Sequence, residues 1–330
     1  MKVAINGFGR IGRAAAKIIL DRDDLELVAV NDLTDAGTLA HLLKYDSVYG
    51  IYDKKVENDQ ISITIDGKKI KVLAEKDPVA LPWEELGIDV VIESTGHFLG
   101  QEKCQAHLKA GAKKVIVSAP AKDEATKTFV FGANEKDYTG EEIISNASCT
   151  TNCIAPVMKV LTDKFGVEKS LMTTVHSYTA DQVLVDGPHK DLRRARSAAI
   201  NIVPTTTGAA TATAKTIPEL SGKFDGLSIR VPSPVVSLSD ITAVLSQKTT
   251  VEEINSALKE AAETTHKGII QYSTDELVST DLKANTFSSI IDSKLTQVIG
   301  GDLVKIIAWY DNEWGYSCRL VDMVEFVGGK

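Results

Sequence analysis

The pattern of apolar and polar residues changes near residue 148. Before that point, short runs rich in β-branched residues alternate with stretches whose apolar residues recur at helical spacing. Several runs are apolar throughout, which is typical of strands covered on both faces of a mostly parallel sheet. The pattern predicts a doubly wound α/β domain over residues 1–148. Its predicted strands span residues 3–5, 27–30, 70–73, 90–92, 115–117, 129–131 and 143–144, its helices 12–20 and 103–110, and a hairpin 61–73.

After residue 148, one helical segment precedes longer strands that have few crossover helices between them. This order favours an α+β domain over residues 149–313, with a mainly antiparallel sheet and helices on one face. Residues 177–207 are rich in charge and lack periodicity, and a loop of that length inside a compact domain is usually functional. The predicted strands of this half span residues 171–177, 227–231, 237–245, 286–291 and 303–311, and a final helix spans 316–326.

Composition narrows the class of protein. The 330 residues exceed a typical single domain, and a hydrophobic share of 43% with a charged share of 25% is ordinary for a globular protein in water. No apolar run approaches the roughly 20 residues that span a bilayer. The net charge of -8 argues against non-specific binding to nucleic acid or to a membrane surface. Four cysteines without a disulfide-like spacing indicate a reducing cytoplasm.

The sequence G-F-G-R-I-G, residues 7–12, follows the first predicted strand and opens a helix. Gly7 permits a tight turn, Gly9 lets the backbone approach a pyrophosphate, and Gly12 lets the helix pack closely on the strand. The second strand leads to Asp32, about twenty residues further on, whose carboxylate can bind the ribose hydroxyls of NAD and repel the 2′-phosphate of NADP. Together these features predict a Rossmann-type NAD site.

Cys149 stands in S-N-A-S-C-T-T-N-C, residues 145–153, where an apolar strand ends and a helix begins. Free N–H groups and the dipole at a helix N-terminus stabilise a thiolate. Cys153 shares a helical face with Cys149, but no other Cys or His pair has metal-ligand spacing, so no metal site is predicted. These residues leave an inert thiol and a nucleophile equally open. His176, which ends a predicted strand, is a candidate base, although a lone histidine is more often structural.

Five motifs, in this order, resemble those of phosphorylating glyceraldehyde-3-phosphate dehydrogenases: I-N-G-F-G-R-I-G-R, S-N-A-S-C-T-T-N-C, H-S-Y-T-A-D-Q, P-T-T-T-G-A-A and W-Y-D-N-E-W-G-Y-S. The second motif is highly specific, whereas the glycine motif alone is not. The resemblance implies that Cys149 attacks the aldehyde carbon of glyceraldehyde 3-phosphate, with His176 as base while hydride passes to NAD. Inorganic phosphate would then release the thioester as 1,3-bisphosphoglycerate.

The resemblance also implies two anion sites for the substrate and inorganic phosphate. One site would use Thr179 and Arg230, the other Ser148, Thr150, Thr207 and Gly208, and Arg194 lies in the long loop within reach of either. Residues 209–215 are alanine-rich and predict a helix, whose N-terminus favours phosphate. From local sequence alone, a buried ion pair is the alternative for Arg230, and a solvated loop is the alternative for the basic cluster at residues 193–196.

For NAD, the resemblance assigns the glycine turn with Arg10 and Ile11 to the pyrophosphate, Asp32 to the ribose, Lys76 to the adenine side, and Ser118 and Asn312 to the nicotinamide. Lys76 stands where arginine is expected, so a backbone contact would survive and a planar stack would weaken. The resemblance places Gly187 in a loop near the adenosine end of a neighbouring subunit's cofactor. Glycine has no side chain to exclude a 2′-phosphate there, which leaves the strictness of the NAD preference open. Without the resemblance, Asn312 is equally read as a turn-forming residue.

The family resemblance further implies a homotetramer and a C-terminal helix, residues 314–330, that packs back on the NAD-binding domain. One alternative is an erythrose-4-phosphate dehydrogenase, which has the same thiol and base but hydrolyses its thioester. A second alternative is a non-catalytic role in binding a nucleotide or RNA on the same scaffold. The acidic charge and the complete motifs argue against that second alternative as the primary role.

Overall fold

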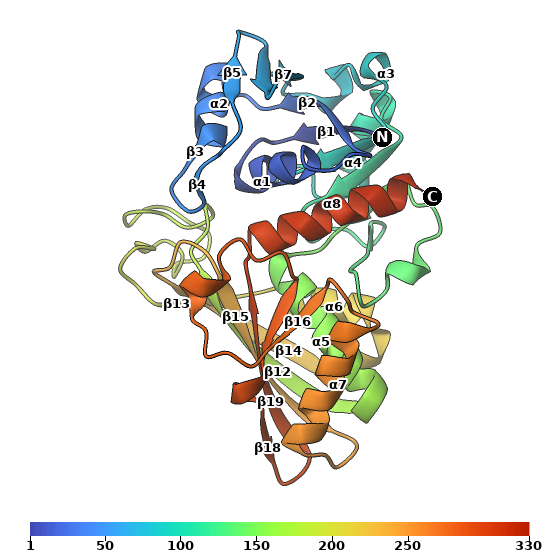
Figure 1. Ribbon diagram of the computed structural model, residues 1–330, viewed down its shortest axis with the longest axis vertical. Coiled ribbons are helices and arrows are strands. Elements are labelled where there is room, and N and C mark those ends of the chain that lie inside the picture. Colours follow the sequence, from blue (N-terminus) through green and yellow to red (C-terminus); the bar gives the residue numbers. More distant parts are fainter. Residues whose placement is uncertain (330) are drawn as a thin grey trace. The chain divides into compact units, whose positions relative to one another are not determined.

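The structure is a computed structural model that describes residues 1–329 (Figure 1). The chain divides into two compact units. The first comprises Met1–Phe129, Tyr138–Ala147 and the chain from Ser317 onward, and the second comprises Val130–Asp137 and Ser148–Tyr316. None of the helices within residues 1–329 is both long enough and apolar enough to cross a bilayer.

The first unit is built on a nine-stranded sheet with the order β10-β11-β9-β8-β1-β2-β7-β6-β5. Every pair from β10 to β7 is parallel, and β6 and β5 add an antiparallel edge. The strands are β1 (Lys2–Asn6), β2 (Glu26–Asn31), β5 (Val56–Asn58), β6 (Ser62–Ile65), β7 (Lys68–Leu73), β8 (Val90–Glu93), β9 (Lys114–Val117), β10 (Lys127–Thr128) and β11 (Ile143–Ser145), with β3 (Tyr45–Asp46) and β4 (Gly50–Ile51) as a separate pair. The helices are α1 (Arg10–Ile19), α2 (Ala36–Lys44), α3 (Trp83–Leu86) and α4 (Gln101–Lys109), the short 3-10 turn η1 (Pro78–Ala80), and most of α8 (Trp314–Gly328).

The register of the parallel strands places polar residues together at the carboxyl ends of three central strands. Asn6, the last residue of β1, pairs with Asn31 of β2 on one side and with Glu93 of β8 on the other. Apart from the exposed Lys2 and Glu26 at the start of β1 and β2, the other residues of these strands are apolar and mostly buried. Because ligands bind at the carboxyl ends of strands in open α/β sheets, a ligand site is expected beside Asn6, Asn31 and Glu93.

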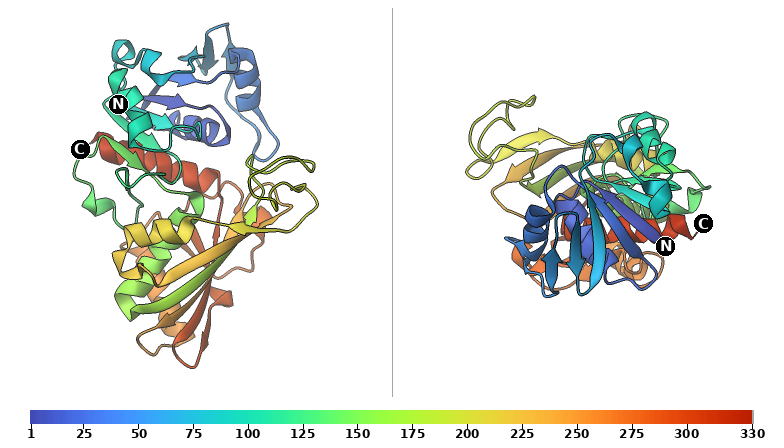
Figure 2. Two further views of the ribbon diagram at one scale, coloured as in Figure 1. Left: turned by 180° about the vertical axis from the view of Figure 1, so that it is seen from behind. Right: turned by 90° about the horizontal axis from the view of Figure 1, so that it is seen from above.

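The second unit has an eight-stranded, mainly antiparallel sheet with the order β13-β14-β12-β15-β19-β17-β16, and β18 pairs with β19. Helices α5, α6 and α7 contact this sheet and α5 contacts both of the others, so they cover one face (Figures 1 and 2). The strands are β12 (Val167–Ser177), β13 (Val203–Thr206), β14 (Phe224–Val231), β15 (Ser237–Leu245), β16 (Ile270–Ser273), β17 (Ser289–Asp292), β18 (Gln297–Ile299) and β19 (Leu303–Tyr310). The helices are α5 (Cys149–Phe165), α6 (Ala209–Thr216) and α7 (Val251–Glu263), with 3-10 turns η2 (Glu135–Asp137), η3 (Pro218–Leu220), η4 (Ser279–Leu282) and η5 (Ser293–Leu295).

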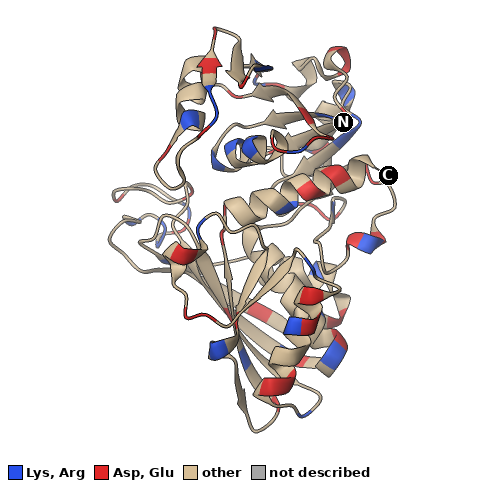
Figure 3. Cartoon of the chain, in the orientation of Figure 1, with Lys and Arg blue, Asp and Glu red and all other residues tan. Residues whose placement is uncertain are grey.

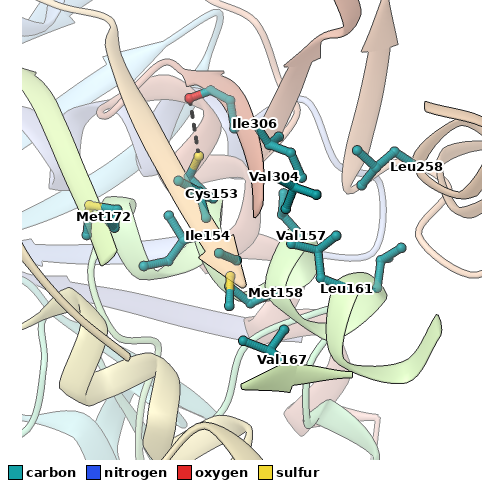
Figure 4. Close-up of a cluster of buried hydrophobic side chains, with 14 of the residues drawn as sticks. Cys153, Ile154, Val157, Met158, Leu161, Val167, Met172, Leu258, Val304 and Ile306 are labelled. Carbon is teal, nitrogen blue, oxygen red and sulfur yellow. Dashed lines mark hydrogen bonds between the residues drawn. The ribbon is translucent and has the colours of Figure 1, made fainter. Parts of the chain in front are cut away.

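The core of the second unit lies between α5 and the sheet. Strand β15 is buried at every second residue, as expected for a sheet with one covered face. Figure 4 shows Cys153, Ile154 and Val157 of α5 beside Val304 and Ile306 of β19. Burial raises the pKa of the Cys153 thiol to about 12. Within residues 1–329, no three His, Cys, Asp or Glu side chains are placed to hold a metal ion.

The surface carries charges of both signs side by side. Helix α8 carries basic Arg319 followed by acidic Asp322 and Glu325, and its basic and acidic positions are coloured in Figure 3. Asp322 on α8 pairs with Arg319 on the same helix and with Arg22 at 2.8 Å. The pair with Arg22 is partly exposed, and pairs of that kind contribute little to stability.

The predicted α/β fold class is confirmed, and the hairpin at residues 61–73 forms as β6 and β7, joined by Asp66 and Gly67 at positive φ. The strand predicted at residues 129–131 is wrong. There the N–H of Phe129 still bonds to the Ser145 carbonyl of β11, but the N–H of Val130 bonds to the Asn134 side chain and Gly132 at φ 78° turns the chain. The strand therefore ends earlier, as β10. The strand predicted at 286–291 begins later, at Ser289.

Candidate active site

The glycines of the first loop occupy positions that differ in how much space surrounds them. Gly7 has φ 93°, and a Cβ there would lie 2.6 Å from the backbone carbon of Ser94. A Cβ on Gly12 would lie 2.2 Å from the carbonyl oxygen of Gly7, so the close helix–strand packing requires glycine. A Cβ on Gly9 would meet nothing within 4 Å. Gly9 therefore borders open space, as a close approach of pyrophosphate requires.

Helix α1 begins beside this space, and its N-terminus has no side-chain cap. Its N-cap residue is Gly9, which provides no side-chain hydrogen bond, and the first turn has no acidic residue. An anion is therefore favoured at this helix end. The guanidinium of Arg10 donates to Asp46 at 2.6 Å and lies over the ring of Tyr49. A phosphate contact at Arg10 or Ile11 would thus come from the backbone and not from the Arg10 side chain.

A cavity of about 490 Å³ lies at the carboxyl edge of the first sheet, within the range of small-molecule sites. Its Asp32 carboxylate accepts hydrogen bonds from the N–H groups of Phe8 at 2.9 Å and Thr34 at 3.1 Å, which fix its position. Of the residues predicted for the cofactor, Gly7, Gly9, Asp32 and Lys76 line the cavity, whereas Arg10, Ile11, Gly12, Ser118 and Asn312 are outside its lining. The lining residues that were not predicted are Asn6, Asn31, Leu33, Glu75, Ser94, Thr95, His97 and Phe98.

In the second unit, helix α5 places Cys149 at its first residue because Ser148 caps the helix. The Ser148 hydroxyl accepts a hydrogen bond from the Thr151 N–H at 3.1 Å. The Cys149 Sγ lies 3.5 Å from Nε2 of His176, near the end of β12. The structure therefore brings together the predicted nucleophile and base, which lie 27 residues apart in the chain.

The contacts of His176 determine which ring nitrogen carries the proton. Nδ1 lies 2.7 Å from the carbonyl oxygen of Ser177, which can only accept, so Nδ1 carries the hydrogen and donates it. Nε2 then presents a lone pair to the Cys149 thiol. Burial, and next the Arg230 charge, lower the pKa of His176 to about 3, so the imidazole is a neutral base at neutral pH. Burial raises the pKa of Cys149, and Arg230 opposes that rise.

Arg230 and Thr179 lie together beside this pair. Nη1 of Arg230 donates to the Ser177 carbonyl and to the Thr179 hydroxyl, both at 3.2 Å, and lies 3.3 Å from Nδ1 of His176. Nε of Arg230 is buried and has no hydrogen-bond partner among the described residues. Since a buried donor without a partner is costly, this group is suited to an anionic ligand.

Arg194 is held inside the long loop, Tyr178–Ile202, which contains neither helix nor strand. Its Nε donates to the Thr205 hydroxyl at 2.9 Å, its Nη2 to the Thr206 carbonyl at 3.0 Å, and its Nη1 pairs with Asp181. Asp181 was not predicted as part of the site. An anion that binds Arg194 has to compete with this carboxylate.

The predicted phosphate hydroxyls of Ser148 and Thr150 already have protein partners. The Ser148 hydroxyl lies 2.8 Å from that of Thr151, in addition to its role as helix cap. The Thr150 hydroxyl lies 2.9 Å from that of Tyr310, which also contacts the Thr174 hydroxyl at 2.9 Å. The Thr150 hydroxyl is therefore part of a buried hydrogen-bond chain with the hydroxyls of Tyr310 and Thr174.

Gly208 is the N-cap residue of helix α6 and provides no side-chain hydrogen bond to the first N–H groups of this helix. A Cβ on Gly208 would meet nothing within 4 Å, and the residue is exposed. Thr207 accepts a hydrogen bond from the Ala209 N–H at 3.2 Å. Helix α6 contacts α5, and Ala209 and Cys149 belong to the same apolar cluster. The predicted anion position at Thr207 and Gly208 thus lies on the helix next to that of Cys149.

Asn312 has a fixed side-chain orientation. Its Oδ1 accepts hydrogen bonds from the hydroxyls of Ser177 at 2.9 Å and Ser237 at 3.2 Å, which leaves Nδ2 as the donor toward a ligand. Two further residues, beside Asn312 and His176, were also not predicted from the sequence. Ser237 gives no signal because it lies in an ordinary strand, whereas Tyr310, whose ring packs edge-on to His176 at 5.9 Å, stands within the last of the five motifs.

Comparison with known proteins covers nearly the whole chain. Residues 1–101 match the family model described as glyceraldehyde 3-phosphate dehydrogenase, NAD binding domain, and residues 148–312 match its C-terminal domain. Glyceraldehyde-3-phosphate dehydrogenase of Geobacillus stearothermophilus is 55% identical over 332 residues, covering 100% of this chain and 99% of that protein. Glyceraldehyde-3-phosphate dehydrogenase of Streptomyces coelicolor is 53% identical over 334 residues, with the same coverage. The chain therefore belongs to the glyceraldehyde 3-phosphate dehydrogenase family and carries that family's NAD-binding domain.

Proposed function

We propose that the chain catalyses the NAD-dependent oxidation and phosphorylation of glyceraldehyde 3-phosphate to 1,3-bisphosphoglycerate in glycolysis and gluconeogenesis. The observation that carries this proposal is the 3.5 Å contact between Cys149 Sγ and Nε2 of His176, with the lone pair of a neutral imidazole facing the thiol. Family membership and the names of the relatives support the choice of substrate.

The proposed chemistry follows from this pair. Nε2 of His176 takes the thiol proton as sulfur attacks the aldehyde carbon, and returns it to the new oxyanion to give a thiohemiacetal. Nε2 then takes the hydroxyl proton while hydride leaves the same carbon, which becomes the thioester of Cys149. Phosphate oxygen attacks the thioester carbonyl, the thiolate leaves, and the acyl phosphate is released. Because His176 is neutral at neutral pH, it is available as a base in both proton transfers.

NAD supplies the hydride acceptor when it is bound. The residues of the first unit fit it: the cavity at the sheet edge, the open space at Gly9, the uncapped start of α1 and the fixed carboxylate of Asp32 are the parts that a dinucleotide requires. We propose that Gly7, Gly9, Arg10, Ile11 and Gly12 form the pyrophosphate turn, with Arg10 and Ile11 acting through the backbone. Asp32 would bind the ribose, Lys76 would border the adenine side, and Ser118 and Asn312 would bind the nicotinamide.

Two anion positions are proposed around Cys149. Arg230 and Thr179 form the first, supported by their mutual hydrogen bond and by the buried, unpartnered Nε of Arg230. Thr207 and Gly208 form the second, supported by their position at the N-terminus of α6, which has no side-chain cap from Gly208 and favours an anion. Ser148, Thr150 and Arg194 would join them only by exchanging their present partners for phosphate oxygens.

We also propose an assembly and a location. Residues 1–148 with the C-terminal helix would form the NAD-binding domain, and residues 149–313 the catalytic domain. A homotetramer is supported by apolar side chains exposed on the long loop, including Leu184, Leu192 and Ile200 at 76%, 81% and 81% exposure. A cytoplasmic location is supported by the four free thiols.

A steady-state assay tests the proposed function. NADH formation is measured with glyceraldehyde 3-phosphate, with and without inorganic phosphate, and with erythrose 4-phosphate in its place. The proposal predicts turnover that requires phosphate and prefers the triose. Turnover that is independent of phosphate, with a higher kcat/KM for erythrose 4-phosphate, would favour the hydrolytic alternative.

A further inference from the structure

We infer that a buried hydrogen-bond network centred on Glu93 positions the wall of the NAD cavity, with His107 and Trp83 as positioning residues for cofactor binding. The inference rests on the proposed assignment of this cavity to NAD. Trp83, Glu93 and His107 are at most 1% exposed and none of them lines the cavity, whereas four of their network partners do. We call this set the Glu93 network: Trp83, His107, Glu93, Asn6, Thr95, Asn31 and Glu75.

At one end of the network, the indole of Trp83 determines which nitrogen of His107 carries the hydrogen. Nε1 of Trp83 lies 3.0 Å from Nδ1 of His107, and an indole N–H can only donate. Nδ1 of His107 is therefore the acceptor, the ring is neutral, and its hydrogen is on Nε2. That hydrogen is donated to Oε2 of Glu93 at 3.1 Å. The buried pair of His107 and Glu93 is thus a hydrogen bond with fixed polarity and not an ion pair.

The second end is set by the backbone of Glu75. Its N–H donates to Oδ1 of Asn31 at 2.8 Å, and its carbonyl accepts from Nδ2 of the same side chain at 2.8 Å. Nδ2 of Asn31 also donates to Oδ1 of Asn6 at 2.7 Å. Nδ2 of Asn6 is therefore left to donate to Oε2 of Glu93, at 2.6 Å. The orientation of both amides is fixed by groups that can only donate or only accept.

Glu93 is where these donors converge. Its Oε2 accepts from Asn6 and His107, and its Oε1 accepts from the backbone N–H of Thr95 at 2.8 Å and from the Thr95 hydroxyl. The Thr95 hydroxyl in turn accepts from the N–H of His97 at 3.1 Å, which fixes its own direction. A buried carboxylate surrounded by four donors holds each of them firmly, because a charged acceptor makes stronger hydrogen bonds.

The consequence lies at the surface of the cavity. Asn6, Asn31, Glu75 and Thr95 line it, and Phe98, which also lines it, packs edge-on against His107 at 6.2 Å. Three adjacent strands and the segment after β7 are thereby held in one arrangement before a ligand arrives. A wall ordered in advance lowers the entropy cost of binding. Removing the donor of His107 is therefore expected to weaken NAD binding without changing the chemical step.

Two substitutions of His107 distinguish an effect on the position of the cavity wall from a general loss of stability. Each variant breaks one buried hydrogen bond, but only one of them breaks the bond to Glu93. His107→Asn keeps an acceptor for Trp83 but loses the donor to Glu93, whereas His107→Gln keeps the donor and loses the acceptor. Melting temperature, Kd for NAD and kcat at saturating NAD are measured for both. The inference predicts that His107→Asn raises the Kd for NAD by about fivefold or more, with kcat at saturating NAD within about twofold of wild type. His107→Gln, the conservative variant, restores most of the affinity.

Equal Kd values in the two variants would overturn the inference, whatever their melting temperatures. A wild-type protein that binds no NAD would overturn the proposed function as well, so the two failures are distinguishable. If neither variant folds, two measurements on the wild-type protein test the inference. Nitrogen-15 NMR is expected to find the proton of His107 on Nε2 at neutral pH, and exchange of the Trp83 indole hydrogen is expected to slow with saturating NAD. A proton on Nδ1, or exchange that NAD leaves unchanged, would contradict the network.

Discussion

Replacing Gly9 by alanine isolates the approach of the cofactor to the glycine turn. Gly9 has φ -73° and ψ -157°, which alanine adopts without strain, and the added methyl group would meet nothing within 4 Å. The stability of the cofactor-free protein is therefore expected to stay within about 0.5 kcal/mol of wild type. If pyrophosphate passes over this residue, the methyl group occupies its space, and overpacking typically costs about 1–3 kcal/mol. The Kd for NAD is then expected to rise roughly 5- to 150-fold.

Gly7→Ala is the matched control with the opposite outcome. Gly7 has φ 93°, and its added Cβ would lie 2.6 Å from the backbone of Ser94, so both strain and overlap oppose alanine in the folded state. A loss of about 2–5 kcal/mol is expected from these two effects together. Thermal unfolding without cofactor and calorimetric titration with NAD measure both quantities for both variants. A Gly9→Ala protein with wild-type stability and wild-type affinity for NAD would refute the placement of the cofactor at this turn.

Three further substitutions test other parts of the site. His176→Asn removes the base, and kcat is expected to fall about 10²- to 10⁴-fold in steady-state assays. Arg230→Gln removes the positive charge that lowers the pKa of Cys149, so the pKa of that thiol should rise. Alkylation of Cys149 by the neutral reagent iodoacetamide at pH 7 should then slow roughly tenfold. An unchanged alkylation rate would contradict this effect of Arg230. Asp32→Ala removes the carboxylate that opposes a 2′-phosphate, so the ratio of kcat/KM for NAD to that for NADP should fall at least about tenfold.

Much of the fold was predictable because its strands are buried on both faces or on alternate residues. The parallel core around β1, β2 and β8 has continuous apolar runs, and β15 was predicted at its observed bounds because its burial alternates without interruption. The strand expected at residues 129–131 failed for a physical reason. After β10 the chain turns, with a hydrogen bond from the Val130 N–H to the Asn134 side chain and one from the Ala133 N–H to the Val130 carbonyl, and an apolar run does not reveal that turn.

The residue types of the site were predictable, but their partners were not. The motifs gave Cys149 and His176, whereas the 3.5 Å contact and the hydrogen on Nδ1 depend on how β12 meets α5. Arg194 was expected to be free for an anion, and only the folded loop reveals its pairing with Asp181. The Glu93 network left no pattern in the sequence, because its members come from separate strands and helices that the fold brings together.

The central claim is that Cys149 forms a thioester that only phosphate releases. A rapid-mixing experiment with saturating NAD and glyceraldehyde 3-phosphate tests it directly. Without phosphate, the account predicts a burst of about one NADH per active site, followed by little further turnover, because the acyl-enzyme accumulates. Adding phosphate should restart steady NADH formation, and Cys149→Ser should abolish the burst. Continuous turnover without phosphate, or a full burst in Cys149→Ser, would contradict the account.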